Sequence, residues 1–335
     1  MYEAFYGLTG KPFQLSPDPK FYFDSRQHRK AMAYLQYGLH QNEGFIVVTG
    51  EVGAGKTTLV RSLFQQLDAE QVVAANLVST QLSADGMLSM VASAFGIPTD
   101  SSDKPRVLRS IEVFLASVAQ EDKRCLLVVD EAQNLSAGAV EELRMLSNFQ
   151  LGNQALLQSF LIGQAEFRHV LQKPAMRQLR QRVIAACHIG PMDMEDTRAY
   201  IQHRLAHAGA GGEHGPQFES GAYERVFAAS GGVPRRVNSL CDRVLLGGFL
   251  AERRTVSAGD VDTVAAQFEE ELASPDADVD AAHAVADQGL PELSARLARL
   301  EVGLQQLESN SAQTLALLHR PPATAPSGTE ESEKG

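Results

Sequence analysis

Five short runs of apolar, mostly β-branched residues alternate along the chain with segments whose apolar positions recur at helical spacing. The runs are expected to form buried strands at residues 45–48, 72–78, 125–129, 156–162 and 183–189. Helical spacing predicts helices after the first strand and at about 84–95, 104–119, 138–149 and 165–171. Alternation of this kind is typical of an α/β protein, so we predict a five-stranded parallel sheet with crossover helices.

The segments on either side of this region have different patterns. Residues 1–24 are rich in aromatic residues and prolines, and the run Ser16 to Pro19 disfavours a helix, so we expect an extended strap across the α/β domain. A helix is predicted over 25–41. After Pro191 the pattern becomes all helical, with helices expected at about 193–208, 220–229, 234–252 and 258–271.

The last part of the chain has little signal for a packed core. Residues 272–289 are rich in Ala, Asp and Pro and are predicted to be a flexible linker. Within 290–319, leucines recur from Leu293 to Leu307 at spacings of four and three, a seam of about two heptads. This segment is either a short coiled coil or an amphipathic helix that docks on a partner or on its own body. Residues 320–335 are predicted to be disordered. The expected divisions are therefore 1–42, 43–190, 191–271, 272–289, 290–319 and 320–335.

Charge and composition argue against several classes of function. Of the net charge of −11, residues 269–335 carry −9, so the first 268 residues carry −2 and have no strong basic footprint for nucleic acid. The three cysteines, Cys125, Cys187 and Cys241, are far apart and argue for a reducing compartment. No apolar stretch approaches the ~20 residues needed to span a bilayer. We therefore expect a cytoplasmic protein with no transmembrane segment.

The first apolar run ends in a phosphate-binding pattern. Gly50, Gly55, Lys56 and Thr57 have the spacing of the P-loop between a strand and a helix. Glycines let the backbone aim successive N–H groups at phosphate oxygens, and the N-terminus of the following helix adds its positive dipole end. The lysine reaches the β- and γ-phosphates, and the threonine hydroxyl is a Mg²⁺ ligand. The residues expected to bind the nucleotide are Gly50, Glu51, Val52, Gly53, Ala54, Gly55, Lys56, Thr57 and Thr58.

The third and fourth runs end in polar residues suited to hydrolysis. Asp130 at a strand end is expected to hold Mg²⁺ together with Thr57, and the adjacent Glu131 is a candidate base that polarises the attacking water. Gln164 follows the fourth run. If that strand lies between the other two, Gln164 either senses the γ-phosphate and orients water or simply caps the next helix. The strap and the first helix either form one wall of the adenine pocket or have only a packing role.

Two arginine positions stand out in the second half. Arg182 directly precedes the fifth run, beside Arg180. Arg235 and Arg236 follow Pro234 at the predicted start of a helix, where the helix dipole disfavours cations unless an anion binds there. His203 and His207, four residues apart, lack a third ligand and are interpreted as surface residues rather than a metal site.

Together these motifs resemble an AAA+ ATPase over roughly residues 1–270. The stretches FYGLTGKPF, SPDP, GEVGAGKTT, DEAQNL and SGGVPRRVN are similar to the general secretion pathway A-type ATPases, and most of all to the secretion ATPase found beside exosortase (PEP-CTERM) exopolysaccharide loci. The resemblance implies strand order 5-1-4-3-2 and a C-terminal all-helical lid. It also implies ATP and Mg²⁺ as ligands, Lys56 and Thr57 as Walker A, and Asp130 and Glu131 as Walker B.

The same resemblance assigns further roles. Gln164 falls at sensor 1, where Asn or Thr is commoner, Arg182 at the arginine finger and Arg235 at sensor 2. We expect an ATP-dependent homo-oligomer, a ring or a filament, that serves an export system and attaches peripherally to the inner membrane through a partner protein. Two alternatives remain: a nucleic-acid-handling AAA+ ATPase of the transposition or loader type, and a slow nucleotide switch that acts as a scaffold.

Overall fold

The computed structural model describes residues 1–16, 18–78, 84–98, 103–210 and 214–273. Residues Met1–Gln267 form a compact first unit, which contains the sheet and nearly all the described helices. The predicted linker, leucine-repeat and tail segments of residues 274–335 lie outside the described residues. No described helix is long and apolar enough to cross a membrane.

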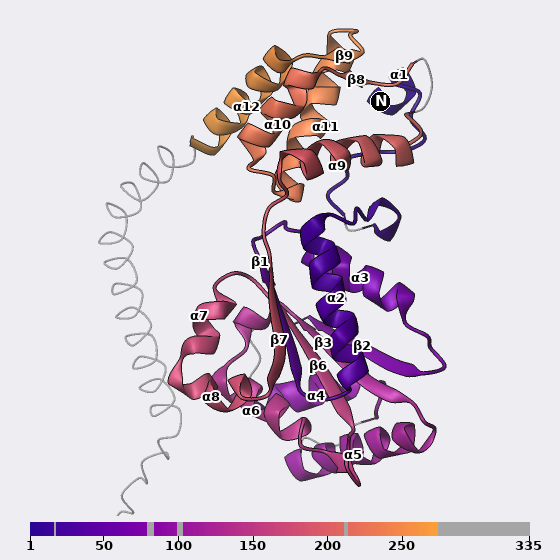
Figure 1. The fold of residues 1–335 in the computed structure, drawn as a ribbon, viewed down its shortest axis with the longest axis vertical. Helices are drawn as coiled ribbons and strands as arrows, with labels where there is room; N and C mark the ends of the chain where they lie inside the picture. The colour runs from indigo at the N-terminus through magenta and orange to yellow at the C-terminus, as the bar shows by residue number, and fades with distance from the viewer. Residues whose placement is uncertain (17, 79–83, 99–102, 211–213, 274–335) are drawn as a thin grey trace, which may run out of the picture. The chain divides into compact units, whose positions relative to one another are not determined.

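A five-stranded parallel sheet forms the centre of the first unit (Figure 1). Its strands are β1 (Phe45–Gly50), β2 (Val72–Val78), β3 (Arg124–Asp130), β6 (Leu157–Gly163) and β7 (Val183–Ile189). The order across the sheet is β2-β3-β6-β1-β7, with all pairings parallel. This is the predicted order 5-1-4-3-2, and it inserts β6 between β1 and β3.

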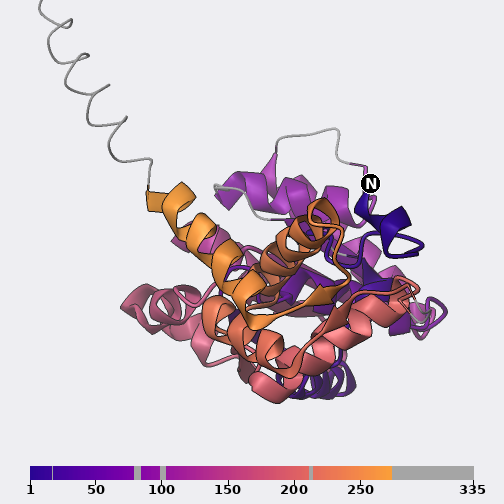
Figure 2. The same cartoon turned by 90° about the horizontal axis from the view of Figure 1, so that it is seen from above.

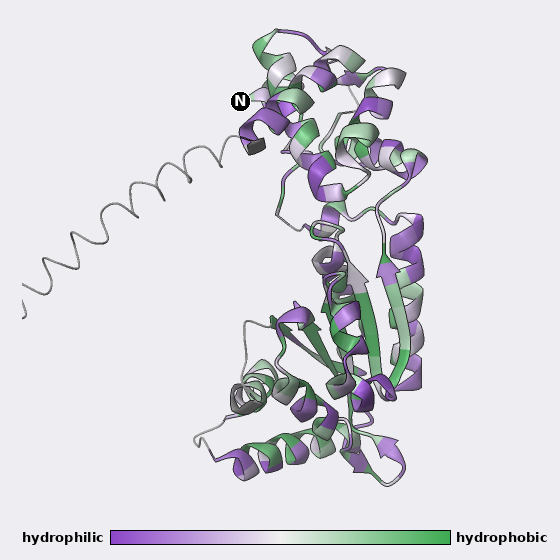
Figure 3. Ribbon diagram, turned by 90° about the vertical axis from the view of Figure 1, so that its left-hand side faces the viewer, coloured by the Kyte–Doolittle hydropathy of each residue, from purple (hydrophilic) through white to green (hydrophobic). Residues whose placement is uncertain are grey.

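Helices cover both faces of this sheet. They are α2 (Arg26–Gln41), α3 (Lys56–Gln66), α4 (Ala84–Ala94), α5 (Lys104–Gln120), α6 (Ala137–Leu146), α7 (Phe167–Gln172) and α8 (Arg177–Arg180), with short 3-10 turns η1 (Pro19–Phe21), η2 (Ala132–Asn134) and η3 (Pro174–Met176). Figure 3 shows largely hydrophobic strands beside helices of mixed polarity. The predicted helices are confirmed, with boundaries shifted by a few residues.

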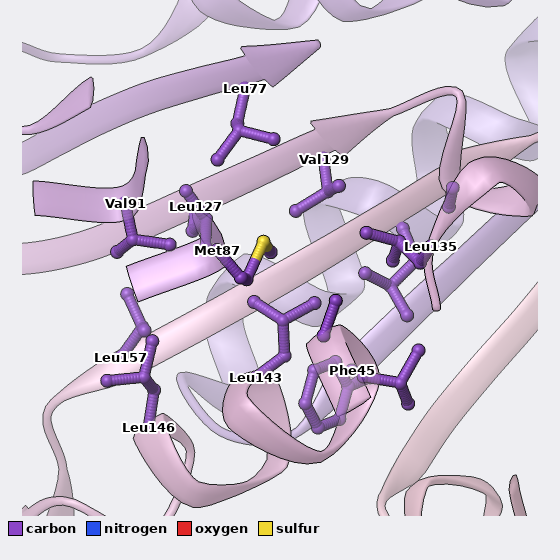
Figure 4. Packing of buried hydrophobic residues seen from close by; sticks show 14 of the residues in the cluster. Phe45, Leu77, Met87, Val91, Leu127, Val129, Leu135, Leu143, Leu146 and Leu157 are labelled. Atoms are coloured by element: carbon purple, nitrogen blue, oxygen red, sulfur yellow. The ribbon is translucent and has the colours of Figure 1, made fainter. Parts of the chain in front are cut away.

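Alternation along the strands divides the core into two layers. In β1, Phe45 and Val47 face the cluster formed with α4, α5 and α6, whereas Ile46 and Val48 face α2 and α3. Figure 4 shows the first cluster, in which Leu127 and Val129 of β3 pack against Met87, Val91 and Leu143 from the covering helices. Burial on both faces explains why the central strands β1, β3 and β6 are largely apolar runs rather than alternating ones.

The C-terminal part of the first unit is a helical lid with one correction to the prediction. Its helices are α9 (Met194–His207), α10 (Ser220–Ser230), α11 (Pro234–Leu250) and α12 (Ala258–Ala273). The lid is not all helical, because β8 (Gln217–Phe218) and β9 (Thr255–Val256) pair in parallel. Val256 is buried there, and the pairing satisfies backbone groups that would otherwise be unbonded.

A second short ladder, β4 (Gln150–Leu151) with β5 (Gln154–Ala155), was also not predicted.

The N-terminal strap differs most from expectation. Its first residues include a one-turn helix, α1 (Tyr2–Phe5), and they pack on the lid rather than across the α/β domain (Figures 1 and 2). Tyr6 is buried, and its hydroxyl donates to the carbonyl oxygens of Leu245 and Arg253, both at 3.2 Å. The ring of Phe5 lies 5.6 Å from that of Phe249. The aromatic side chains pack here because α11 offers them an apolar surface.

Candidate nucleotide-binding site

The P-loop connects buried β1 to α3 and borders a cavity of about 340 Å³. Gly53 and Gly55 have φ values of 83° and 90°, a left-handed conformation that favours glycine. Gly55 is the N-cap of α3, so the unpaired N–H groups of that helix begin at the loop. This arrangement can hold phosphate groups, as the glycine spacing predicts.

Lys56 lies beneath the loop with its side chain buried. Its Nζ donates to the carbonyl oxygens of Gly50 and Glu51, both at 2.8 Å. Burial lowers the pKa of Lys56 below its ordinary value, and the nearby carboxylates of Glu131 and Asp130 oppose that shift. The ammonium group is therefore held where phosphate oxygens would approach the P-loop.

Thr57 and Asp130 meet at the ends of α3 and β3. The Thr57 hydroxyl donates to Asp130 Oδ2 at 3.1 Å, and the backbone N–H of Glu131 donates to Asp130 Oδ1 at 2.9 Å. Asp130 is 4% exposed, and burial raises the pKa of its carboxyl. One hydroxyl and one carboxylate are hard oxygen donors, which fit Mg²⁺ held mainly by water and substrate phosphates. The described residues contain no group of three or more His, Cys, Asp or Glu side chains able to hold a metal.

Glu131 is bound by two glutamine side chains. Its Oε2 accepts hydrogen bonds from Gln133 Nε2 at 2.5 Å and from Gln164 Nε2 at 3.2 Å. Gln133 also accepts a bond from the backbone N–H of Gln164, 2.9 Å from its Oε1. Glu131 has φ 55°, a conformation that few non-glycine residues adopt and that is common at functional sites. The insertion of β6 thus brings Gln164 to Glu131, as the sequence-based hypothesis required.

Gln133 is a site residue that the sequence analysis did not assign. Its amide bridges the end of β3 and the end of β6, through Glu131 and the Gln164 backbone. The sequence feature that could have indicated this role is a glutamine two residues after the acidic end of a strand. That signal alone does not distinguish a bridge from an ordinary loop residue.

The cavity is closed on its other side by the strap and the lid. Its lining includes Phe21 and Tyr22 of the strap and Tyr200 and Asn238 of the lid, together with Gly53 and Lys56. Arg204 binds the strap to the lid through a hydrogen bond from Nη2 to the Gln14 carbonyl oxygen at 3.2 Å, and its guanidinium lies 4.9 Å from the centre of the Phe21 ring. Aromatic and polar groups beside a phosphate loop provide surfaces for a base and ribose.

Arg235 joins the P-loop to the lid. Its backbone N–H donates to the Gly53 carbonyl oxygen at 3.2 Å, and a Cβ on Gly53 would lie 2.4 Å from Arg235 Cβ. The side chain is exposed and lines the cavity. Pro234 begins α11, as predicted. The structure therefore brings Arg235 to the same cavity as Lys56, Thr57, Glu131 and Gln164.

Arg182 and Arg180 do not line this cavity. The guanidinium of Arg182 is half-buried and donates from Nη1 to Ser147, at 2.9 Å to Oγ and 3.2 Å to the carbonyl oxygen. Its backbone carbonyl accepts from the N–H of Phe45, at the end of β1 opposite the P-loop. Arg180 is exposed, and its Nη1 donates to the Gln172 carbonyl oxygen at 3.3 Å. Arg180 is thus the more accessible of the two candidate fingers.

The rings of His203 and His207 lie side by side in a tilted arrangement. Their ring centres lie 4.0 Å apart, and His207 Nδ1 is 2.9 Å from the His203 carbonyl oxygen. His203 is half-buried against Phe23 of the strap, so only His207 is a surface residue as predicted.

The comparisons with known proteins agree with this fold. Residues 39–171 match a family described as "AAA domain". Together with the sheet order and the P-loop, this match identifies an AAA domain and agrees with the predicted fold class. The chain is 38% identical over 267 residues to "General secretion pathway protein A" of Aeromonas hydrophila. The aligned region covers 79% of this chain and 48% of that protein. The chain thus spans about half the length of this curated relative.

Solved structures share the fold at low sequence identity. The ORC2 protein of Aeropyrum pernix, in ADPNP-ADP complexes, has a TM-score of 0.58 and 15% identity. The aligned region covers 76% of this chain and 71% of the ORC2 chain. Drosophila ORC bound to DNA has a TM-score of 0.56 and 17% identity, and the aligned region covers 77% of this chain and 64% of the ORC chain. Cdc6p of Pyrobaculum aerophilum has a TM-score of 0.54 and 16% identity, and the aligned region covers 76% of this chain and 69% of the Cdc6p chain. At these identities the likeness supports the fold alone.

Proposed function

We propose that this protein binds ATP with Mg²⁺ and hydrolyses it, using the pocket between the P-loop, β3, β6 and the lid. The observation that carries the proposal is the convergence of Lys56, the Thr57–Asp130 pair and Glu131 on one cavity. Lys56 and Thr57 come from the start of α3, and Asp130 and Glu131 come from the end of β3. Their meeting supports phosphoanhydride hydrolysis more than simple nucleotide storage.

The residues divide the chemistry between them. The P-loop N–H groups and Lys56 bind and orient the phosphates, and Arg235 adds positive charge from the lid. Thr57 and Asp130 would hold Mg²⁺, and the ion would supply neutralisation of the phosphate charge. Glu131 accepts a proton from the attacking water, and Gln164 orients that water from the end of β6. The strap residues Phe21 and Tyr22 wall the adenine, rather than only packing.

The protein acts as an ATP-dependent homo-oligomer. A finger arginine supplied by a neighbouring subunit would approach the γ-phosphate from outside, which requires head-to-tail packing into a ring or filament. Exposure supports Arg180 for this role over Arg182, because Arg180 is exposed whereas Arg182 is half-buried against Ser147.

We assign the protein to an export system of the bacterial envelope. Identity of 38% with a general secretion pathway protein supports this role, and the motif resemblance supports the exosortase-linked exopolysaccharide type. The protein works at the cytoplasmic side, peripherally at the inner membrane through a partner. The nearly neutral first 268 residues do not favour the nucleic-acid alternative.

The test compares the wild-type protein with Lys56→Ala. Wild type should bind ATP with Mg²⁺ and hydrolyse it, and the variant should lose tight binding in calorimetry, because the charge that meets the β- and γ-phosphates is gone. Inverted inner-membrane vesicles from cells that carry the export system should stimulate hydrolysis more than protein-free liposomes do. Stimulation by duplex or single-stranded DNA, without any by the vesicles, would favour the nucleic-acid alternative instead.

A further inference from the structure

The first turn of α2 contacts the P-loop from inside the α/β domain. Ser25 is the N-cap of this helix and is fully buried, and its Oγ accepts from the backbone N–H of His28 at 3.3 Å. The His28 side chain is 6% exposed. A buried polar side chain beside a phosphate loop, outside the P-loop motif itself, is a candidate for a role in the site.

His28 lies against the two P-loop residues that precede Lys56. A Cβ built on Gly55 would lie 2.8 Å from His28 Nε2. The imidazole also lies beside the backbone of Ala54, which opposes the lowering of the His28 pKa. The Ala54 N–H is already donated to the Glu51 carbonyl oxygen at 3.1 Å, so the Ala54 carbonyl is the group left to accept. The loop therefore approaches the ring so closely that position 55 has no room for a side chain.

The environment of the ring determines which nitrogen carries the proton. Burial lowers the pKa of His28 below its ordinary value, so the imidazole is neutral, with one donor and one acceptor nitrogen. Nδ1 lies 2.7 Å from Ser25 Oγ. The serine hydroxyl can donate to Nδ1, and the proton of the neutral ring is then on Nε2, the nitrogen that faces the loop.

We propose that His28 is a positioning residue of the nucleotide site that holds the Ala54–Gly55 segment ready to receive phosphate. Glycine-rich backbone loses the most conformational freedom on ordering, so an unsupported loop would bind nucleotide at a larger entropic cost. A donor fixed on α2 reduces that cost before the nucleotide arrives. Arg235 supports the other end of the loop at Gly53. This inference rests on the proposed nucleotide-binding function.

A pair of amide variants separates this role from packing. In His28→Asn the amide reaches the position of Nδ1 and keeps a partner for Ser25, but it is too short to reach the P-loop. In His28→Gln the amide reaches the position of Nε2 and can still donate to Ala54. His28→Asn should therefore raise the Kd of mant-ATP and mant-ADP by roughly three- to tenfold, the value of one hydrogen bond. His28→Gln should recover most of that loss.

Two further measurements make the test specific. Because His28 acts on loop order rather than on the reacting atoms, His28→Asn should raise KM while kcat stays within about twofold. Without nucleotide, amide hydrogen exchange in peptides covering residues 50–58 should be faster in His28→Asn than in wild type. His40→Asn, an exposed position on the same helix, is the matched control and should change neither quantity.

The outcomes distinguish the inference from the function on which it rests. Equal nucleotide Kd and equal exchange in His28→Asn and wild type would overturn the positioning role alone. A similar loss in both amide variants would also overturn it, because the donor at Nε2 would then be irrelevant. Absence of nucleotide binding by the wild-type protein would overturn the proposed function together with this inference.

Discussion

Gln164 Nε2 donates to Glu131 Oε2 across 3.2 Å, which joins the ends of β6 and β3 directly beside the P-loop. A glutamine in this position can orient a water molecule and can also hold the carboxylate until that water is present. The second bond to Glu131, from Gln133, fixes the carboxylate further. Glu131 is thus a restrained group, and its chemistry can be tested separately from nucleotide binding.

Glu131→Gln should leave nucleotide binding intact and reduce kcat by roughly 10²-fold or more, because an amide cannot accept the proton of the attacking water. Single-turnover hydrolysis and mant-ATP titration measure the two effects. Glu112→Gln, at an exposed position of α5, is the control and should hydrolyse at the wild-type rate. Hydrolysis at the parent rate by Glu131→Gln would exclude Glu131 as the base.

Gln133→Leu should lower kcat by about tenfold and leave KM nearly unchanged, because it removes a hydrogen bond to a charged group without removing a phosphate contact. The leucine has similar size, so the fold should be retained and the melting temperature should fall little. Gln65→Leu, exposed on α3, is the control. An unchanged kcat would mean that Gln164 alone positions Glu131.

Arg180→Ala should bind ATP normally and lose hydrolysis that depends on protein concentration, by ~10³-fold if the residue is the finger of a shared site. Arg182→Ala should instead lower the melting temperature, because the Ser147 hydroxyl and carbonyl lose their donor. The decisive assay mixes Arg180→Ala with Lys56→Ala, which supplies an intact finger but cannot bind ATP. Mixed oligomers that remain inactive would argue against a shared site.

Gly232→Ala should destabilise the junction between β7 and the lid far more than Gly231→Ala does. Both glycines have positive φ, at 71° and 60°, so both substitutions carry backbone strain of roughly 1 kcal/mol. A Cβ at position 232 would also lie 2.0 Å from the Met192 carbonyl oxygen, whereas one at 231 meets nothing within 4 Å. The additional loss should be about 2 kcal/mol or more. Chemical denaturation of both variants measures the difference, and equal stabilities would contradict the close approach.

The sequence by itself determined the features that depend on local pattern. Continuous apolar runs predicted the five strands, and the three central strands β1, β3 and β6 are largely apolar because both of their faces are buried. The spacing from Gly50 to Thr57 predicted the P-loop because backbone curvature and phosphate contact need those residue types in that order. The strand order, and with it the meeting of Gln164 and Glu131, followed from the family resemblance and is confirmed by the topology.

Only the tertiary structure decided the contacts between groups far apart in the chain. The strap packs on the lid because Tyr2 and Tyr6 find partners about 240 residues away, at Asp242 and Leu245, and no local periodicity encodes that choice. His28 lies outside the motifs quoted above, and Gln133 lies within DEAQNL but had no role assigned to it. Their roles arise because α2 packs beside the P-loop and β6 inserts next to β3. Hydrogen bonds are directional and short-ranged, so such partners are known only when the backbones that carry them have been placed.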